Sequence, residues 1–206
     1  MKRVPSWSSI NALAMTLYLS PLLLALAPPC HALGPQQKVQ WLEHSGTCDG
    51  SAAVPLGSTR FVAANDEEDA LRVYARDRSG PPQWKLDLTE FLDPSDADDR
   101  EADLEGATTI GQRIFWIGSH SLSRKGLERP RRCQLFATDI VGEGASLRLK
   151  PAGRPYRHLL DDIRAHPDFV RLGLTKALSI APEQTGGFNI EGLGSTSDGR
   201  LWVGLR

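Results

Sequence analysis

The residues with the clearest potential for chemistry are three acids that each precede a glycine. Asp49, Glu105 and Glu191 stand in Asp-Gly, Glu-Gly and Glu-Gly pairs, at intervals of 56 and 86 residues. Carboxylates that are brought together repel one another unless a positive charge joins them, and their oxygens are ligands that Ca²⁺ and Mg²⁺ prefer. We therefore expect Asp49, Glu105 and Glu191 to be metal ligands for a divalent cation, calcium or magnesium, where the fold gathers them.

Polar residues near these acids indicate what such a cation would help to do. His120 is a candidate catalytic residue, because a histidine with an ordinary pKa can act as a general base near neutral pH. Arg124 and Lys125 are candidates for holding an anionic substrate by charge-assisted hydrogen bonds. Asn65 and Asp66 are candidates for further substrate contacts from a neighbouring loop. A cation that polarises an ester or phosphate oxygen would make this group a hydrolase.

Each of these signals also has a structural interpretation. A carboxylate that accepts backbone N–H bonds in a turn, beside a glycine with positive φ, explains a recurring acid-Gly pair without any ligand. His120 is then a loop or interface residue, and the basic run 124–132 is a solvated loop. The acidic stretch 93–103 lacks the spacing of an EF-hand and is typical of a solvated linker. The sequence leaves both interpretations open.

The acid-Gly pairs lie near the start of a repeated sequence motif. This motif indicates which secondary-structure elements position them. The stretches DLEGATTIGQRIFWIG (103–118) and NIEGLGSTSDGRLWVG (189–204) align without a gap, and a weaker copy occupies 48–66. Each copy is typical of a β-hairpin. Two further short strands follow the copy at 48–66, and two follow the copy at 103–118. Four-stranded antiparallel units repeated around a centre are the blades of a β-propeller. Trp116 and Trp202 occupy equivalent positions and are expected to pack within blades.

The sequence thus predicts an all-β chain that forms an incomplete β-propeller of two blades and half of a third, with a short helical insertion. Propellers close with about 4–8 blades, so we expect a piece of a longer domain, or pairing with another copy. In such blades the acids and the loops after the second strands share one face, at the mouth of the central channel. The predicted segments are blade one at about 48–92, blade two at about 104–153, the insertion at about 156–174 and the half blade at about 188–206.

The amino-terminal segment predicts export. Residues 1–32 carry a short charged start, an apolar stretch and small residues before Gly34, as in a secretory signal peptide. The remaining 33–206 would be a periplasmic or secreted domain with no membrane association. An uncleaved anchor and a lipoprotein modified at Cys30 are the alternatives. Cys48 and Cys133 either pair in the oxidising compartment or remain separate thiols. A net charge of −1 argues against nucleic acid as a partner.

Three long stretches identify a family resemblance. They are CDGSAAVPLGSTRFVAANDEEDALRVY, EADLEGATTIGQRIFWIGSHSLSRKGLERPRRCQLFA and GGFNIEGLGSTSDGRLWVGLR. They closely resemble the bacterial domain-of-unknown-function 3616 family, and the resemblance covers the chain from about Val39 onward. It implies that members normally continue past the end of this chain. It implies no particular activity.

Two functions of different classes follow. The first is a metal-assisted hydrolase of an ester, lactone or phosphoester at the channel mouth. Propeller lactonases, whose blades open with a similar Glu-Gly, use such a glutamate as a metal ligand, which is a local analogy. The second is a non-catalytic propeller that binds a small molecule or a protein ligand on the same face. The cofactor expected in the first case is the divalent cation.

Overall fold

The computed structural model describes residues 40–92 and 101–206. The predicted signal peptide at 1–32 and most of the acidic stretch at 93–103 lie outside the described residues. Within the described part of the chain, no helix is long and apolar enough to span a membrane.

The described residues form mainly β-strands, arranged in three antiparallel sheets. The first sheet has the order β1 (Gly50–Leu56), β2 (Arg60–Asn65), β3 (Ala70–Ala75), β4 (Trp84–Asp87). The second has the order β5 (Leu104–Ile110), β6 (Arg113–Gly118), β7 (Leu135–Val141), β8 (Arg148–Tyr156). The third pairs β9 (Ile190–Ser195) with β10 (Leu201–Leu205). The all-β class and the four-stranded antiparallel sheets are thus as predicted.

Glycines at the hairpin turns allow each sheet to begin with a tight connection. Gly57 between β1 and β2 and Gly111 between β5 and β6 have φ of 67° and 60°. These left-handed angles are strained for residues with a Cβ atom. The turns therefore allow β1 to pair with β2 and β5 to pair with β6, and the repeated sequence motif forms a repeated hairpin.

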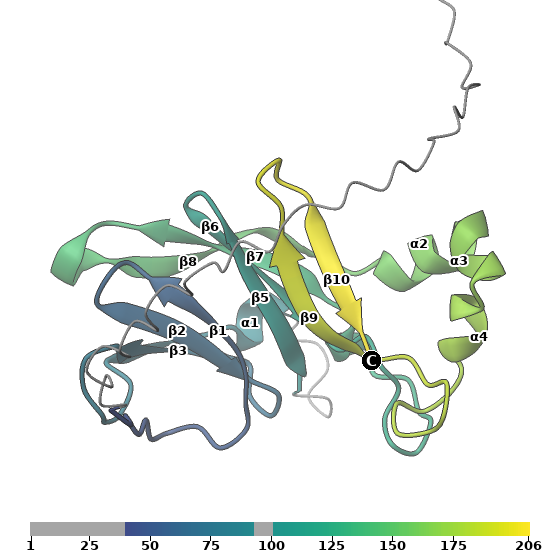
Figure 1. Cartoon of the computed structure of the whole chain (residues 1–206), viewed down its shortest axis with the longest axis horizontal. Coiled ribbons are helices and arrows are strands. Elements are labelled where there is room, and N and C mark those ends of the chain that lie inside the picture. Colours follow the sequence, from purple (N-terminus) through teal and green to yellow (C-terminus); the bar gives the residue numbers. More distant parts are fainter. Residues whose placement is uncertain (1–39, 93–100) are drawn as a thin grey trace, which may run out of the picture. The chain divides into compact units, whose positions relative to one another are not determined.

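The opening strands β1, β5 and β9 lie next to one another in that order (Figure 1). Glycine makes the closest of these contacts possible: a Cβ atom on Gly106 in β5 would lie 2.6 Å from the backbone nitrogen of Leu193 in β9. Side chains also join the strands, since the hydroxyl of Thr108 lies 2.9 Å from that of Ser195. The three sheets therefore meet along their first strands.

One hydrophobic core joins the first two sheets. Val62, Val73, Leu104 and Trp116 are completely buried in it. The Trp116 indole N–H donates to the Thr138 hydroxyl at 3.0 Å, so the buried polar atom is satisfied. The packing role predicted for Trp116 agrees with this burial.

The equivalent residue of the third sheet behaves differently. Trp202 is 67% exposed, because among the described strands β10 pairs only with β9. The tryptophan therefore does not pack within a sheet here, contrary to the expectation from its alignment with Trp116.

A buried ion pair fastens the loop after β6 to the first sheet. The Arg131 guanidinium contacts the Asp69 carboxylate and donates to the Thr89 carbonyl at 3.2 Å. The other Asp69 oxygen accepts the backbone N–H of Ala102 at 2.9 Å. Both side chains are at least 97% buried, so the pair has to satisfy its own hydrogen bonds.

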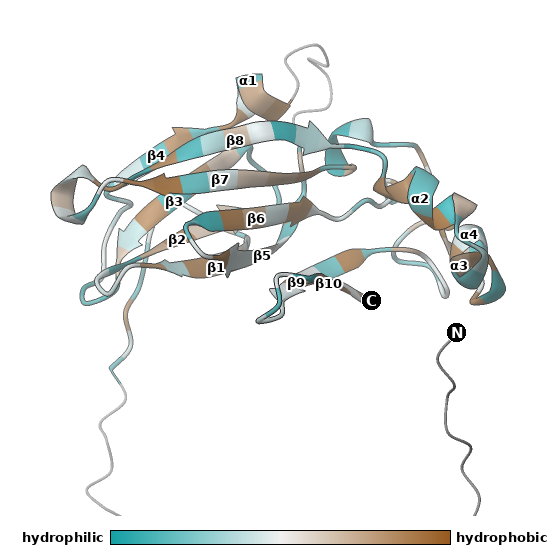
Figure 2. Ribbon diagram, turned by 90° about the horizontal axis from the view of Figure 1, so that it is seen from above, coloured by the Kyte–Doolittle hydropathy of each residue, from teal (hydrophilic) through white to brown (hydrophobic). Residues whose placement is uncertain are grey.

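Short helices occupy the segment between β8 and β9. These are α2 (Leu159–Ala165), α3 (Pro167–Arg171) and α4 (Leu174–Ala177), so the helical segment predicted at 156–174 extends three residues further. Each carries both hydrophobic and hydrophilic residues (Figure 2). Their apolar residues pack against Ile117 and Ile190 in a second hydrophobic cluster. Further short helices are α1 (Thr89–Leu92), η1 (Pro130–Arg132) and η2 (Gly144–Ser146).

Cys48 and Cys133 are not joined to each other by a disulfide, and Cys48 is exposed. Of the two alternatives left open by the sequence, the structure does not have the Cys48–Cys133 pair.

Candidate functional site

A pocket of about 800 Å³ lies where β5 and β9 begin and where β2 and β6 end. In antiparallel hairpins the start of the first strand and the end of the second meet at one edge of the sheet. The pocket therefore gathers residues that are distant in sequence. We call it the acidic pocket. Its lining residues are Asp66, Glu67, Glu101, Asp103, Glu105, Ser121, Ser123, Arg124, Lys125, Leu127, Arg129, Arg132, Pro182, Glu183, Asn189, Glu191 and Arg206.

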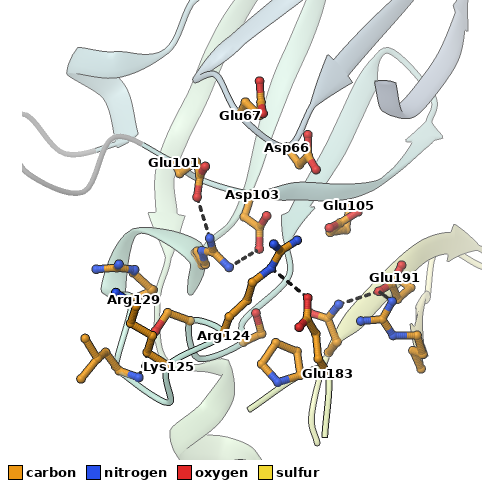
Figure 3. A pocket seen from close by; sticks show the side chains of 17 residues that line it. Asp66, Glu67, Glu101, Asp103, Glu105, Arg124, Lys125, Arg129, Glu183 and Glu191 are labelled. Atoms are coloured by element: carbon orange, nitrogen blue, oxygen red, sulfur yellow. Dashed lines mark hydrogen bonds and ion pairs between the residues drawn. The ribbon is translucent and has the colours of Figure 1, made fainter. Parts of the chain in front are cut away.

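Three carboxylates form a tight group in this pocket. Asp66, Asp103 and Glu105 each offer one oxygen, and these oxygens all lie within 4.8 Å of one another. Asp66 directly follows β2, while Asp103 and Glu105 come from the start of β5. Figure 3 shows these acids on one side of the pocket, across from Arg124, Lys125 and Arg129.

Glu105 is poorly compensated by its surroundings. Its carboxylate makes no hydrogen bond or ion pair with any residue that the structure describes. Burial raises the pKa of the Glu105 carboxyl to about 7, and the negative charges of Asp103 and Glu191 contribute to the rise. The ionised form is thus disfavoured until a positive charge reaches this group.

Asp103 is held more firmly. Its side chain pairs with the Arg132 guanidinium at 3.0 Å, and its backbone carbonyl accepts the N–H of Ser119 at 2.9 Å. Burial nevertheless raises the pKa of Asp103 above its ordinary value, against the opposing effects of Ser119 and Arg132. Its φ of 49° lies in the left-handed region, which is uncommon for residues other than glycine. The hydrogen bond from Ser119 to the Asp103 carbonyl helps to hold this backbone conformation.

Bulges place the two glutamates. Glu105 is an extra residue between the pairs Leu104–Gly118 and Gly106–Ile117, so it has no partner across the ladder. Glu191 is the extra residue in the same position of β9. A bulge bends the strand and redirects the side chain of its unpaired residue, and bulges are frequent beside active sites.

Asn189 completes the pocket at the start of β9. It is 6% exposed, its amide nitrogen donates to Glu191, and its Oδ1 is buried without a hydrogen-bond partner among the described residues. Glu191 also pairs with Arg206 at 3.1 Å. The Oδ1 atom of Asp66 is a second buried oxygen that no described residue satisfies. Unsatisfied buried acceptors of this kind require an explanation, such as an ion.

The formal charge of the pocket is negative. Seven carboxylates and five cationic side chains line it, which leaves −2 when all are ionised. A divalent cation would neutralise this charge.

The pocket contains some of the residues predicted from sequence and omits others. Glu105, Glu191, Arg124 and Lys125 all line it, as does Asp66, which belongs to the carboxylate group and not to the substrate loop as expected. Asp103 and Asn189 were not predicted. The available signal was their common position, two residues before the bulge glutamates Glu105 and Glu191.

Asp49 is exposed and is not among the lining residues. The alignment that placed it beside Glu105 was two residues out of register. The bulge in β1 lies between Gly50 and Ala52, so Ser51 is the structural equivalent of Glu105, and Asp49 that of Asp103. The fold therefore does not bring Asp49 to the other two predicted ligands.

Asn65 and His120 also lie elsewhere. Asn65 is 2% exposed, and its Oδ1 accepts the Glu68 backbone N–H at 3.1 Å, which stabilises the turn after β2. His120 lines a different cavity, beside the helices. A general base has to reach the reacting atoms, so a reaction in the acidic pocket does not use His120 in this arrangement.

Comparison with known proteins gives one match. No curated protein and no solved structure matches the chain significantly. Residues 49–137, which include Asp66, Asp103, Glu105 and the loop after β6, match the family described as "Protein of unknown function (DUF3616)". By its pattern over these residues, the chain resembles the DUF3616 family.

Proposed function

We propose that the acidic pocket binds a divalent cation and that the protein is an exported, propeller-type hydrolase of an anionic ester or phosphoester. The observation that carries the proposal is the group formed by Asp66, Asp103 and Glu105, whose oxygens lie within 4.8 Å of one another. The unpartnered Glu105 carboxylate and the unsatisfied Oδ1 atom of Asn189 lie in the same pocket.

The chemistry of the donors limits the kind of ion. Carboxylates and the amide of Asn189 line the pocket, whereas His120 lines another cavity. Oxygen donors suit Ca²⁺, Mg²⁺ or Mn²⁺ better than Zn²⁺ or Cu²⁺. Asp66, Asp103 and Glu105 would hold the cation, with Asn189 and Glu191 beside them. One oxygen of Asp103 pairs with Arg132, and the same carboxylate belongs to the group of three acids.

The basic side chains supply the substrate preference. Arg124, Lys125 and Arg129 line the pocket opposite the acids (Figure 3). Arg124 pairs with Glu183 at 2.8 Å, but its side chain is 84% exposed. Such exposed pairs contribute little stability, so a substrate phosphate or carboxylate can replace Glu183 as the partner of Arg124.

When bound, the cation would polarise the scissile ester or phosphoryl group and lower the pKa of a coordinated water. The protein residues would orient the substrate and the acidic side chains. The arginines hold the anionic group of the substrate, and the bulges of β5 and β9 keep Glu105 and Glu191 directed at the pocket. Glu105 makes no hydrogen bond to a described residue, so it is available as a ligand or as the acceptor of a proton.

The propeller arrangement is part of the proposal. It is supported by two consecutive four-stranded antiparallel sheets and a third hairpin, whose first strands are neighbours in chain order. The bulge that recurs near the start of each first strand supports it as well. The acidic pocket would then lie at the mouth of the central channel. Export is supported by the composition of residues 1–32.

Cation-dependent turnover tests the function. The full chain is freed of metal by chelation and then assayed with p-nitrophenyl acetate and bis(p-nitrophenyl) phosphate, with and without CaCl₂, MgCl₂ or MnCl₂. We expect turnover of the phosphodiester to require a cation and to be lost in Glu105→Gln. The control is Glu90→Gln, which removes the same charge from an exposed position in α1. Cation binding without turnover would favour the binding module, and no cation response at all would rule out the cation-dependent hydrolase.

A further inference from the structure

A second cavity, of about 600 Å³, lies between the loop after β6, the helix α2 and the residues that directly follow α4. We call it the His120 cavity. Its lining residues include His120, Ser121, Cys133, Arg157, Arg164 and Leu178. Ser121 and Arg129 line this cavity and the acidic pocket alike, so the loop after β6 forms a wall between the two.

The imidazole of His120 is held in one orientation and one tautomer. Its Nδ1 atom lies 2.8 Å from the Gly118 carbonyl oxygen, which can only accept, so Nδ1 carries the proton. Burial lowers the pKa of His120 to about 4, so the ring is neutral at physiological pH. The remaining nitrogen, Nε2, is therefore a hydrogen-bond acceptor.

This acceptor has no partner among the residues that the structure describes. His120 is 2% exposed, and its Nε2 atom is buried without a hydrogen bond. A buried polar atom left unsatisfied costs about 1–3 kcal/mol. Nε2 is closed to solvent in this structure, so a hydroxyl group of a bound molecule would remove this cost once the side chains around the atom move slightly.

The backbone at His120 is also unusual. Its φ of 54° lies in the left-handed region, which glycine adopts at much lower cost. Hydrogen bonds on both sides hold it there: the Ser119 N–H donates to Asp103 and the His120 N–H to Arg132, at 2.9 and 3.2 Å. Strained residues of this kind cluster at functional sites, and His120 lines the cavity.

The charge of the cavity favours an anion. Arg129, Arg157 and Arg164 line it together with two acids, Glu128 and Asp161, so its formal charge is +1 with His120 neutral. Arg164 pairs with Asp161 at 3.1 Å, and both side chains are largely exposed. An anionic group of a ligand can therefore replace Asp161 as the partner of Arg164 at little cost.

We propose that the His120 cavity binds a small organic anion that also carries a hydroxyl group. The hydroxyl donates to Nε2 of His120, and the arginines hold the carboxylate or phosphate. This site is separate from the acidic pocket and needs no cation.

Calorimetry on the full chain in EDTA tests the proposal without involving the cation site. The probes are glycerol 3-phosphate and glycerate, which carry both groups, and inorganic phosphate and glycerol, which carry one each. We expect saturable binding of at least one hydroxylated anion, with inorganic phosphate and glycerol about tenfold weaker or more, as the loss of one such hydrogen bond implies. Comparing the first two probes distinguishes a phosphate ligand from a carboxylate ligand. Equal affinity for inorganic phosphate, or no binding of either hydroxylated anion, overturns the proposal.

Two matched variants locate the binding. Arg164→Gln and Arg171→Gln each remove an exposed ion pair to the aspartate three residues earlier, but only Arg164 lines the cavity. We expect Arg164→Gln to weaken the binding of the hydroxylated anion about tenfold and Arg171→Gln to leave it unchanged. Equal effects of the two substitutions contradict a ligand at this site.

His120 itself is tested by a substitution and by a measurement that needs none. His120→Asn keeps a residue that tolerates the left-handed backbone, and it should abolish the preference for the hydroxylated anion over inorganic phosphate. In the unsubstituted protein, the ¹⁵N resonance of His120 Nε2 should move on addition of that anion, as an acceptor nitrogen does when it gains a hydrogen bond. A resonance that stays in place at saturation refutes the contact even if the variant does not fold.

Discussion

Replacing Glu105 by glutamine should stabilise the metal-free protein while removing its response to cations. Glutamine keeps the size of the side chain but not its charge. The Glu105 carboxylate has no hydrogen-bond or ion-pair partner among the described residues, so the change breaks no such contact. It removes the repulsion from Asp103, Glu191 and Asp66, which is part of the reason for the raised pKa of Glu105.

The size of the effect follows from the pKa. Burial, with the neighbouring acids, raises the pKa of Glu105 from 4.5 to about 7. Each unit corresponds to about 1.4 kcal/mol, so the ionised carboxylate destabilises the folded state by at most about 3 kcal/mol above pH 7. Because Glu105 is only partly buried, we expect about 1–2 kcal/mol, or roughly 2–8 °C in melting temperature.

The sign depends on pH. Below about pH 4.5 the carboxyl is protonated in both the folded and the unfolded protein, so Glu105 and its glutamine variant should be equally stable. Between the two pKa values the folded state binds more protons, and the unsubstituted protein loses stability as pH rises. Above about pH 7 the difference is complete and constant.

Thermal and urea unfolding in EDTA at about pH 4 and pH 8, repeated with excess CaCl₂ or MnCl₂, measure these changes. At 100 times its dissociation constant a cation should stabilise the unsubstituted protein by about 2.7 kcal/mol and the variant far less. Glu90→Gln controls for the change in net charge. A variant that is less stable than the unsubstituted protein at pH 8 in EDTA would refute this reasoning, because it would show that the Glu105 carboxylate accepts structural hydrogen bonds.

Two further predictions concern the contacts that build the pocket. Arg131→Met should lower the free energy of unfolding by about 3–5 kcal/mol, because it leaves the buried Asp69 carboxylate without its cation; urea unfolding measures the loss, and the double variant with Asp69→Leu should recover much of it. Gly106→Ala should destabilise the protein and weaken cation binding together, since its Cβ atom would lie 2.6 Å from the Leu193 backbone nitrogen and push β9 away from β5. Unchanged melting temperature and cation affinity in that variant would show that the two strands are not in close contact.

The bulges explain which part of the candidate site could be read from the sequence. The Glu-Gly pair that predicts Glu105 and Glu191 recurs in similar local sequence, and the structure places both residues in one pocket. The alignment of Asp49 with Glu105 is wrong because the first copy has a serine, Ser51, at the bulge. The acid two residues before it is the one that the sequence alignment matches with Glu105. The register of strand pairing decides which residue is equivalent to Glu105. It depends on the partner strand and cannot be read from the spacing within one strand.

The sequence by itself determined the family resemblance, the four-stranded antiparallel units and the glutamates near the start of β5 and β9. Local patterns suffice for these features, because alternation, turn glycines and repetition act within a few residues. Only the tertiary structure decided that Asp66 and Asp103 join Glu105, that Asn189 borders the same pocket, and that His120 belongs to another cavity. These groupings depend on how separate sheets pack against one another and on where the loop after β6 divides the space, which no single segment of the chain specifies.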